Sequence, residues 1–276
     1  MSSRSRNALR TLGIGVLALG AASGFDAPRA LRVCADPNNL PFSNERQEGF
    51  ENRIAELVAR DLGRVVRYTW WAQRRGFVRN TLNADLCDVI VGVPAGYDPV
   101  LTTRPYYRST YAFVWRSDKP LGIRTFDDPR LKTLRVGVPV VGDDYAATPP
   151  AEALLRRGIV TNVIGFSVYG DYRQPNPPAR LIDAVARGDI DVAIAWGPLA
   201  GYFAHRSKRL DVVPIAPESE PGVRLAFAIA MGVRRRDKAL RDSLDVILVK
   251  RRAEIEGILD RYGVPRLAPA PPRAED

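Results

Sequence analysis

The feature that most constrains the fold of this chain is an alternation of strand and helix patterns that occurs twice along the sequence. In the first occurrence, strand-like apolar runs alternate with amphipathic helical periodicity over residues 31–35, 49–62, 65–70, 74–82 and 88–93. The last run is apolar throughout, which is typical of a buried parallel strand. A β-α-β-α-β unit of this kind predicts a parallel sheet with right-handed crossovers.

A second unit of the same kind follows in the middle of the chain. We expect its alternating strands and helices at residues 133–138, 149–157, 162–166, 178–187 and 189–195. The repetition predicts an α/β protein with two lobes, each a mostly parallel sheet flanked by helices. The 276 residues of the chain, of which 46% are hydrophobic, are enough for two such cores.

The segments between the units indicate that the chain passes from one lobe to the other twice. A strand rich in aromatic and β-branched residues at 106–116 leads into a first hinge, expected near 117–121. A return is expected near 217–222, because another apolar strand follows at 225–233.

The last two predicted helices, at 237–249 and 251–262, close the first lobe. We therefore expect a discontinuous lobe 1 at residues 25–118 and 219–264. Lobe 2 is expected at residues 119–218, joined to lobe 1 by a double hinge.

The first 24 residues have the pattern of a secretory signal peptide. Three arginines precede an apolar run over residues 12–22, and small residues follow it. The run is shorter than the roughly 20 residues that span a bilayer, so we expect cleavage after Ala22 or Gly24 and a periplasmic protein without a membrane span. At the other end, closely spaced prolines predict a disordered tail over residues 265–276.

The charge of the chain favours acidic partners, but not nucleic acid. The formal net charge of +10 includes the three signal-peptide arginines, which leaves +7 for the mature chain. Basic clusters such as 74–75 and 234–236 are scattered, and no nucleic-acid-binding motif accompanies them. They are expected to be solvated surface, with a docking surface for another periplasmic protein as the alternative.

Four short motifs lie at or near the ends of predicted strands and helices. They are Asp-Pro-Asn-Asn-Leu-Pro-Phe at 36–42, Gly-Phe-Glu at 49–51, Arg-Pro-Tyr-Tyr at 104–107 and Gly-Asp-Ile-Asp-Val-Ala at 188–193. In these motifs the chain resembles the type II periplasmic binding proteins of the polar amino-acid family, over nearly the whole mature chain. The resemblance implies a two-lobed, double-hinged fold that binds its ligand between the lobes.

Longer runs narrow the resemblance to one type within that family. These runs cover residues 34–44, 49–52, 68–71, 74–82, 87–88 and 92–98. In them the chain resembles the MxaJ/XoxJ type, the binding proteins encoded beside quinoprotein methanol dehydrogenases. The resemblance implies a non-enzymatic periplasmic role in support of a pyrroloquinoline-quinone (PQQ)-dependent alcohol dehydrogenase, in its maturation or activation. The dehydrogenase is the implied partner, with its cytochrome c as a further candidate.

Two departures from the amino-acid binders bear on the ligand. Those proteins clamp the substrate carboxylate with an arginine in a Thr-x-x-Arg segment, where this chain has Gly-Tyr-Asp-Pro at 96–99. They hold the ammonium group with an aspartate, where this chain has Trp196. Without these clamps the desolvation of a free amino acid is uncompensated, so a free amino acid is not the expected ligand.

The cleft is instead expected to be wide and aromatic, suited to a peptide segment, a protein loop or an apolar planar ligand. Core packing is the alternative for Trp70 and Tyr172. The candidate residues for binding a ligand or partner in this cleft are Asp36, Phe42, Trp70, Trp71, Tyr97, Asp98, Arg104, Asp143, Asp144, Tyr145, Tyr172 and Trp196.

Two other functions stay open: the binding component of an ABC transporter for a solute other than an amino acid, and a dehydratase-like enzyme. An enzyme would need carboxylates placed for proton transfer, and Asp36 and Asp98 are the first-lobe candidates. The single histidine, His205, lies near no nucleophile pattern. Neither a cofactor nor a metal is expected, because the acidic pair at 143–144 has no further acids at ligand spacing.

The two cysteines, Cys34 and Cys87, leave the existence of a disulfide open. An oxidising compartment favours the bond. The expected register opposes it, because an offset of three or four residues along parallel strands corresponds to about 10 to 13 Å. A disulfide needs Cα atoms within about 7 Å, so a bond would require strand one to be slipped or bent.

Overall fold

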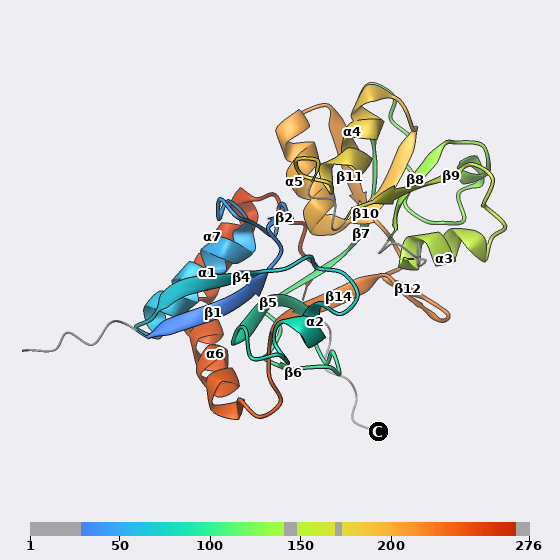
Figure 1. Ribbon diagram of the computed structural model, residues 1–276. Coiled ribbons are helices and arrows are strands. Elements are labelled where there is room, and N and C mark those ends of the chain that lie inside the picture. Colours follow the sequence, from blue (N-terminus) through green and yellow to red (C-terminus); the bar gives the residue numbers. More distant parts are fainter. Residues whose placement is uncertain (1–28, 141–147, 169–172, 269–276) are drawn as a thin grey trace, which may run out of the picture.

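The computed structural model describes residues 29–140, 148–168 and 173–268 (Figure 1). The predicted signal peptide at 1–24 lies outside the described residues, as do residues 269–276 of the predicted tail. The architecture is the expected α/β fold, with a mixed, mostly parallel sheet flanked by helices. We use lobe 1 for the part built on β1, β4, β5 and β14, and lobe 2 for the part built on β8, β9, β10 and β11.

Lobe 1 begins with the predicted β-α-β-α-β unit. Strands β4 (Val65–Trp70), β1 (Ala30–Ala35) and β5 (Val89–Pro94) lie side by side and are parallel. Helix α1 (Phe50–Asp61) buries Ile54 and Val58 against this sheet, as its apolar periodicity predicts. The predicted second helix is reduced to α2 (Phe77–Asn80), because Gly76 before it has a left-handed backbone with φ of 86°.

The C-terminal segment completes lobe 1 by adding an inner strand to its sheet and two helices to one face. Strand β14 (Ala226–Val233) lies between β5 and the strand β7 and is antiparallel to both. Helices α6 (Lys238–Lys250) and α7 (Arg252–Arg261) then pack on the same face as α1 (Figure 1). A core of buried aliphatic side chains from strands and helices fills this face.

Lobe 2 repeats the arrangement with a parallel group of three strands. Its sheet contains β10 (Val192–Trp196), β8 (Val136–Val140) and β9 (Val163–Ser167), and β11 (Leu210–Pro214) joins antiparallel to β7. Helix α3 (Pro149–Leu155) contributes to the core on one face, and α4 (Ala179–Arg187) and α5 (Gly197–Ser207) cover the other. The sequence analysis had no helix at 197–207.

One strand, β7 (Tyr107–Arg116), belongs to both lobes. Residues 107–110 pair with β14 of lobe 1, and residues 111–114 pair with β10 of lobe 2. The sheet therefore changes lobe between Thr110 and Tyr111, some residues before the segment 117–121 where the hinge is expected. The expected lobe boundaries at 118/119 and 218/219 stay a prediction.

Residues 265–268 lie against β7, where the Leu267 N–H donates to the Arg108 carbonyl at 3.0 Å.

Short elements connect these strands and helices. The remaining elements are β2 (Asn38–Asn39), β3 (Ser43–Asn44), β6 (Leu101–Thr102), the 3-10 helix η1 (Pro129–Lys132), β12 (Ser219–Glu220) and β13 (Val223–Arg224).

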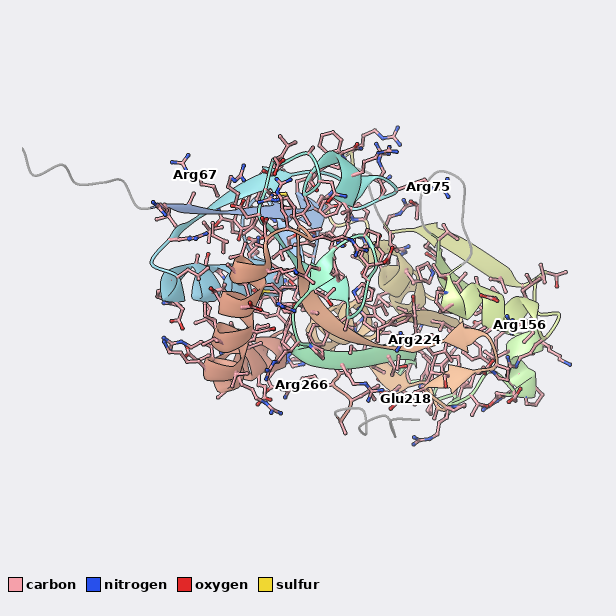
Figure 2. All side chains as sticks on the ribbon, turned by 90° about the horizontal axis from the view of Figure 1, so that it is seen from below. Arg67, Arg75, Arg156, Glu218, Arg224 and Arg266 are labelled. Atoms are coloured by element: carbon pink, nitrogen blue, oxygen red, sulfur yellow. A yellow bond between two sulfur atoms is a disulfide. The ribbon has the colours of Figure 1, made fainter. Side chains whose placement is uncertain are left out.

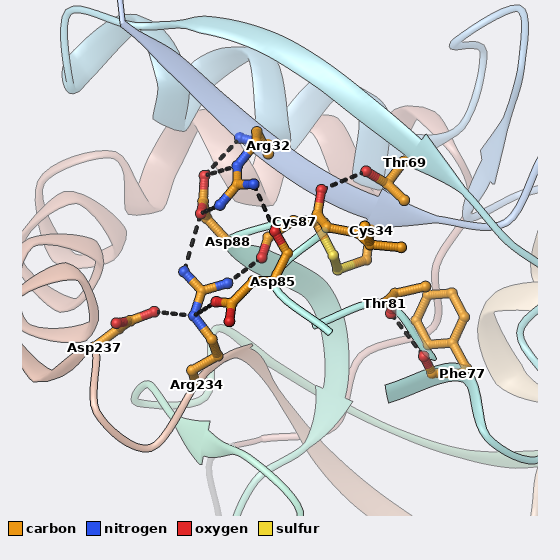
Figure 3. The surroundings of a disulfide bond; sticks show 11 residues. Arg32, Cys34, Thr69, Phe77, Thr81, Asp85, Cys87, Asp88, Arg234 and Asp237 are labelled. Carbon is orange, nitrogen blue, oxygen red and sulfur yellow. Dashed lines mark hydrogen bonds and ion pairs between the residues drawn. A yellow bond between two sulfur atoms is a disulfide. The ribbon is translucent and has the colours of Figure 1, made fainter. Parts of the chain in front are cut away.

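Cys34 and Cys87 form a disulfide, with their Cα atoms 5.5 Å apart (Figure 3). The register is the expected one, since Cys34 pairs with Ile90 on β5, three residues beyond Cys87. The expected Cα–Cα distance of about 10 to 13 Å was wrong, because the chain at Cys87 does not extend in the direction of β5. The turn that precedes it folds back over β1, held by the Thr69 hydroxyl, which donates to the Leu86 carbonyl at 2.7 Å.

A network of ion pairs lies beside the disulfide (Figure 3). Asp88 binds Arg32 at 2.6 Å and Arg234 at 3.0 Å, and Arg234 also binds Asp237 at 2.7 Å. The Arg32 and Arg234 guanidinium groups hold the pKa of Asp88 below its usual range, despite partial burial. This network joins β1, the start of β5 and the segment after β14 at one end of the lobe 1 sheet.

The basic side chains do not form a single stripe. Figure 2 shows Arg67 and Arg156 at opposite ends of the molecule, with Arg224 and Arg266 between them. Many arginines are paired, as Arg157 is with Glu220 at 2.8 Å. This distribution agrees with the expectation of solvated surface. No helix in the described ranges is long and apolar enough to cross a membrane.

Candidate functional site

A cavity of about 250 Å³ lies where the sheet passes from lobe 1 to lobe 2. Tyr107 and Tyr111 come from either side of the crossing in β7, and both line it. Lobe 1 supplies most of the other walls, and lobe 2 supplies Trp196. The lining residues are Asn39, Phe42, Glu51, Gln73, Gly92, Val93, Pro94, Tyr107, Tyr111, Trp196, Phe227 and Ile229.

The start of α1 places a carboxyl group, that of Glu51, in this cavity. The first backbone N–H groups of the helix donate to loop carbonyls, Phe50 to Pro41 at 2.8 Å and Glu51 to Phe42 at 3.0 Å. Gly49 is needed here, because a Cβ atom would lie 1.9 Å from the Phe42 carbonyl oxygen. The Glu51 carboxyl then packs over Gly92 of β5, where any side chain would collide with it.

Glu51 has an unusual electrostatic environment. Within residues 29–140, 148–168 and 173–268, no group donates a hydrogen bond to its carboxylate. Burial among apolar and aromatic groups raises the pKa of Glu51 to about 8. The pKa of the nearby Tyr106 phenol is also raised, by burial and by the charges of Tyr107 and Glu51.

A second acceptor in the cavity wall also lacks a donor. The Asn39 amide donates to Gln73 Oε1 at 3.0 Å, but its own Oδ1 is buried without a hydrogen-bond donor in the described part of the chain. Asp36 holds the backbone of this wall in place. Its carboxylate accepts hydrogen bonds from the backbone N–H groups of Asn38 at 2.8 Å and Gln73 at 2.7 Å. Burial raises the pKa of Asp36.

Aromatic rings form the remaining walls. Trp196, at the end of β10, lies edge-to-face between Tyr111 at 5.4 Å and Phe227 at 5.8 Å between ring centroids. Gly197 follows it at the start of α5, where a Cβ would lie 2.5 Å from the Thr110 carbonyl oxygen. This close approach holds Trp196 against the crossing in β7.

Of the candidate cleft residues, Phe42 and Trp196 line this cavity and the other described ones do not. Trp70 stacks on Tyr68 with ring centroids 4.5 Å apart, beside the lobe 1 core. Trp71 and Tyr97 are exposed.

The charged candidates also lie elsewhere. Asp98 is 96% exposed and pairs with Arg235, and Arg104 lines a separate groove beside α6 and α7. Asp143, Asp144, Tyr145 and Tyr172 lie outside the described residues. A cleft role for the residues that do not line the cavity stays a prediction.

Glu51, Tyr111 and Phe227 were not predicted from the sequence as site residues. Glu51 was part of the Gly-Phe-Glu motif at 49–51, which marked it only as the start of a helix. Tyr111 and Phe227 are strand residues whose alternation shows which face they share, but not that a cavity opens there. These positions become neighbours only through the crossing of β7 and the insertion of β14.

The described lining carries no arginine, lysine or histidine, and Glu51 is its only carboxyl group. An anionic ligand would therefore have no counter-charge within this lining. No group of three or more metal-ligating side chains occurs within the described ranges. The lining also includes the side-chain amides of Asn39 and Gln73 and the hydroxyls of Tyr107 and Tyr111, so it presents hydrogen-bonding groups among aromatic faces.

Comparisons with known proteins agree on one family. A family model described as bacterial extracellular solute-binding protein matches residues 96–245. Protein MoxJ of Methylorubrum extorquens AM1 is 36% identical over 251 residues, which cover 86% of this chain and 81% of MoxJ. The crystal structure of periplasmic binding protein XoxJ from Methylobacterium extorquens AM1 is 39% identical, with a TM-score of 0.71, over 86% of this chain and 99% of XoxJ. That of MxaJ from Methlophaga aminisulfidivorans MPT is 29% identical, with a TM-score of 0.75, over 86% and 100%.

Proposed function

Because this chain belongs to the MxaJ/XoxJ type of periplasmic solute-binding proteins, we propose that it supports a PQQ-dependent alcohol dehydrogenase in the periplasm. In this proposal it binds the dehydrogenase, or a peptide or apolar ligand, at the cavity between its lobes during maturation or activation of the enzyme. The cytochrome c of that enzyme is a further candidate partner. The family supports the choice of enzyme, and the cavity supports the mode of binding.

The observation that carries the proposal is the composition and size of the cavity. Its aromatic walls, Phe42, Trp196 and Phe227 among them, are of the kind that receive an anchor side chain at protein interfaces. A volume of about 250 Å³ is below the roughly 300 to 1,000 Å³ of most small-molecule pockets. It suits one protruding side chain or a small ligand better than a bulky planar molecule.

The same lining restricts the class of solute that the protein could bind for an ABC transporter. A free amino acid would bring a carboxylate, and no cationic side chain among the described lining residues would pair with it. Transport of another solute would require tight binding of that solute by the protein alone. A tightly bound solute together with no affinity for the dehydrogenase would favour transport over the accessory role.

The two carboxylates predicted for a dehydratase-like enzyme, those of Asp36 and Asp98, do not line the cavity. The Asp36 carboxylate accepts two backbone N–H groups, and Asp98 is exposed beside Arg235. Neither lines the cavity, so they are not placed as a pair for proton transfer. Asp36 and Asp98 therefore give the enzymatic alternative no support.

The test uses purified methanol dehydrogenase of the quinoprotein class from the same organism, immobilised on a biosensor. We expect the exported protein to bind it, and the Trp196→Asp variant to bind at least about tenfold more weakly. Arg67→Ala, on the edge strand β4 away from the cavity, is the matched control. Absence of binding by the unmodified protein, or equal binding by both variants, would contradict the proposal.

A further inference from the structure

We infer that the cavity between the lobes takes an alkylammonium group, with Glu51 as its counter-ion and the aromatic walls around its carbon chain. The inference rests on the proposed function only in taking this cavity as the binding site. Two sources can supply the group: a lysine side chain of the dehydrogenase, or a free small alkylamine.

The first argument is the charge and hydrogen-bond character of the walls. Glu51 and the Oδ1 atom of Asn39 lie in the lining, and the Asn39 atom is buried without a hydrogen-bond donor among the described residues. Buried acceptors without donors are costly, and a ligand that brings N–H donors removes that cost. A primary ammonium brings three donors and a positive charge. A carboxylate or phosphate brings only acceptors and would disfavour ionisation of Glu51, whereas an ammonium group favours it.

The second argument is the position of the carboxyl group within the aromatic lining. Glu51 is held over Gly92 by the start of α1, and Phe42, Tyr107 and Phe227 are among the rings that line the same cavity. Aromatic faces attract an ammonium group within about 6 Å of the ring centroid, and more strongly where water is excluded. Their apolar surface also packs against methylene groups, so the walls suit both parts of an alkylammonium.

One cationic side chain, that of Arg224, contacts a ring of the cavity wall. The guanidinium of Arg224 lies 5.5 Å from the centroid of Phe227, but Arg224 is exposed and does not line the cavity. Its charge is therefore screened by water and salt, whereas a ligand in the cavity lies directly beside Glu51. The contact also shows that the Phe227 ring can accept a cation on its face.

The third argument is size. The cavity, of about 250 Å³, has room for a chain of a few carbon atoms with a terminal ammonium. The end of a lysine side chain has these dimensions and this charge, and its ammonium, with a pKa of about 10.4, stays protonated at neutral pH. A protein partner or a peptide would therefore place a single side chain in the cavity.

The test is isothermal titration calorimetry of the exported protein with n-butylammonium chloride, and with n-butanol as a neutral analogue of similar shape. We expect butylammonium to bind at least about tenfold more tightly than butanol, because a charge-assisted hydrogen bond is lost with the alcohol. Glu51→Gln should abolish this preference, since it keeps the shape and removes the charge. Glu56→Gln, on the same helix and paired with Arg53 at the surface, is the matched control and should keep it.

Equal binding of the two probes, no binding of butylammonium, or an unchanged preference in Glu51→Gln would overturn the inference. The comparison of probes on the unmodified protein does not depend on how a variant folds. Failure of the dehydrogenase to bind would overturn the proposed function but would leave a measured preference for butylammonium intact. The two proposals therefore fail separately.

A competition experiment distinguishes the two sources of the ammonium group. If saturating butylammonium displaces the protein from immobilised dehydrogenase, the site takes a lysine side chain of the partner. If butylammonium binds with the expected preference but displaces nothing, the site takes a free alkylamine. Either result supports an alkylammonium site.

Discussion

Replacing Glu51 by glutamine should make the protein more stable at neutral pH and should remove a pH dependence from its unfolding free energy. The carboxyl group is raised from an ordinary pKa of 4.5 to about 8 in the folded protein by burial. Between these values the folded state holds a proton that the unfolded state has released. The unfolding free energy contributed by Glu51 therefore falls as pH rises from about 4.5, and stops falling above about pH 8.

The magnitude follows from 1.36 kcal/mol for each pH unit within this window. From pH 5.5 to 7.5 the unmodified protein should lose about 2.7 kcal/mol relative to Glu51→Gln, with about 5 kcal/mol as the upper limit over the whole window. Water that enters the cavity reduces the desolvation of the carboxylate, so the measured loss should lie below that limit. Glutamine has nearly the same shape and is not charged at any pH in this window.

The assay is urea unfolding of both proteins at half-unit steps from pH 5 to 8.5. The difference between their unfolding free energies isolates Glu51, because the other ionisable groups are common to both. Glu56→Gln, which removes a surface carboxyl group from the same helix, serves as a control. A constant difference for Glu51→Gln would show that the carboxylate is already charged in the folded protein, and would refute the reasoning.

Three further predictions concern other parts of the molecule. Replacing both Cys34 and Cys87 by alanine should lower the unfolding free energy in urea by about 4 kcal/mol, because the bond closes a loop of 53 positions. Asp88→Asn should cost roughly 3 kcal/mol at pH 7 in the same assay, because Arg32 and Arg234 lose their shared carboxylate. The pKa of Asp88 is lowered, so this cost should diminish as acidification protonates the carboxyl in the unmodified protein. Trp196→Asp should reduce binding of the dehydrogenase more than it reduces the melting temperature, because the ring lines the cavity.

Each of these predictions has its own control. Asp98→Asn removes a pair with Arg235 that is almost fully exposed and should leave stability unchanged. Free thiols in the unfolded, unreduced protein would contradict the disulfide. A large loss of melting temperature with unchanged binding would identify Trp196 as a core residue instead.

The strands and helices of the two β-α-β-α-β units could be predicted because their signals are local. The apolar periodicity predicted α1 at 49–62, and the helix runs over Phe50–Asp61. Helix α5 was missed, since it begins with Gly197 and Pro198, which resemble a turn in the sequence. Its start depends on the close contact between Gly197 and β7, which is a tertiary feature.

The candidate site could be predicted only in part, for a similar reason. Phe42 and Trp196 were identified because they occupy cleft positions of a family that the sequence resembles. A carboxylate in the first turn of a helix has an ordinary explanation in the helix dipole, so Glu51 attracted no notice. Its role depends on Gly92, 41 positions later in the sequence, which leaves room for the carboxyl over β5.

The disulfide shows the limit of arguments from register alone. The predicted offset of three or four residues between Cys34 and Cys87 agrees with the observed three, but the distance inferred from it was wrong. Residues before a strand need not continue its line. The turn over 81–87, closed by the Leu86 N–H donating to the Thr81 carbonyl at 3.1 Å, brings the cysteine back across the sheet.

The position of β14 in the lobe 1 sheet has a consequence for the order in which the protein folds. β14 separates β5 from β7, yet it is made after all of lobe 2. A chain that emerges from the N-terminus onward can complete the lobe 2 sheet while lobe 1 still lacks its inner strand and the helices α6 and α7. The edge of β5 and the part of the sheet face that α6 and α7 cover stay open during that interval, when an incomplete sheet is most prone to aggregate. The bond between Cys34 and Cys87 needs only the first 87 residues, so it can hold β1 to the start of β5 until β14 arrives.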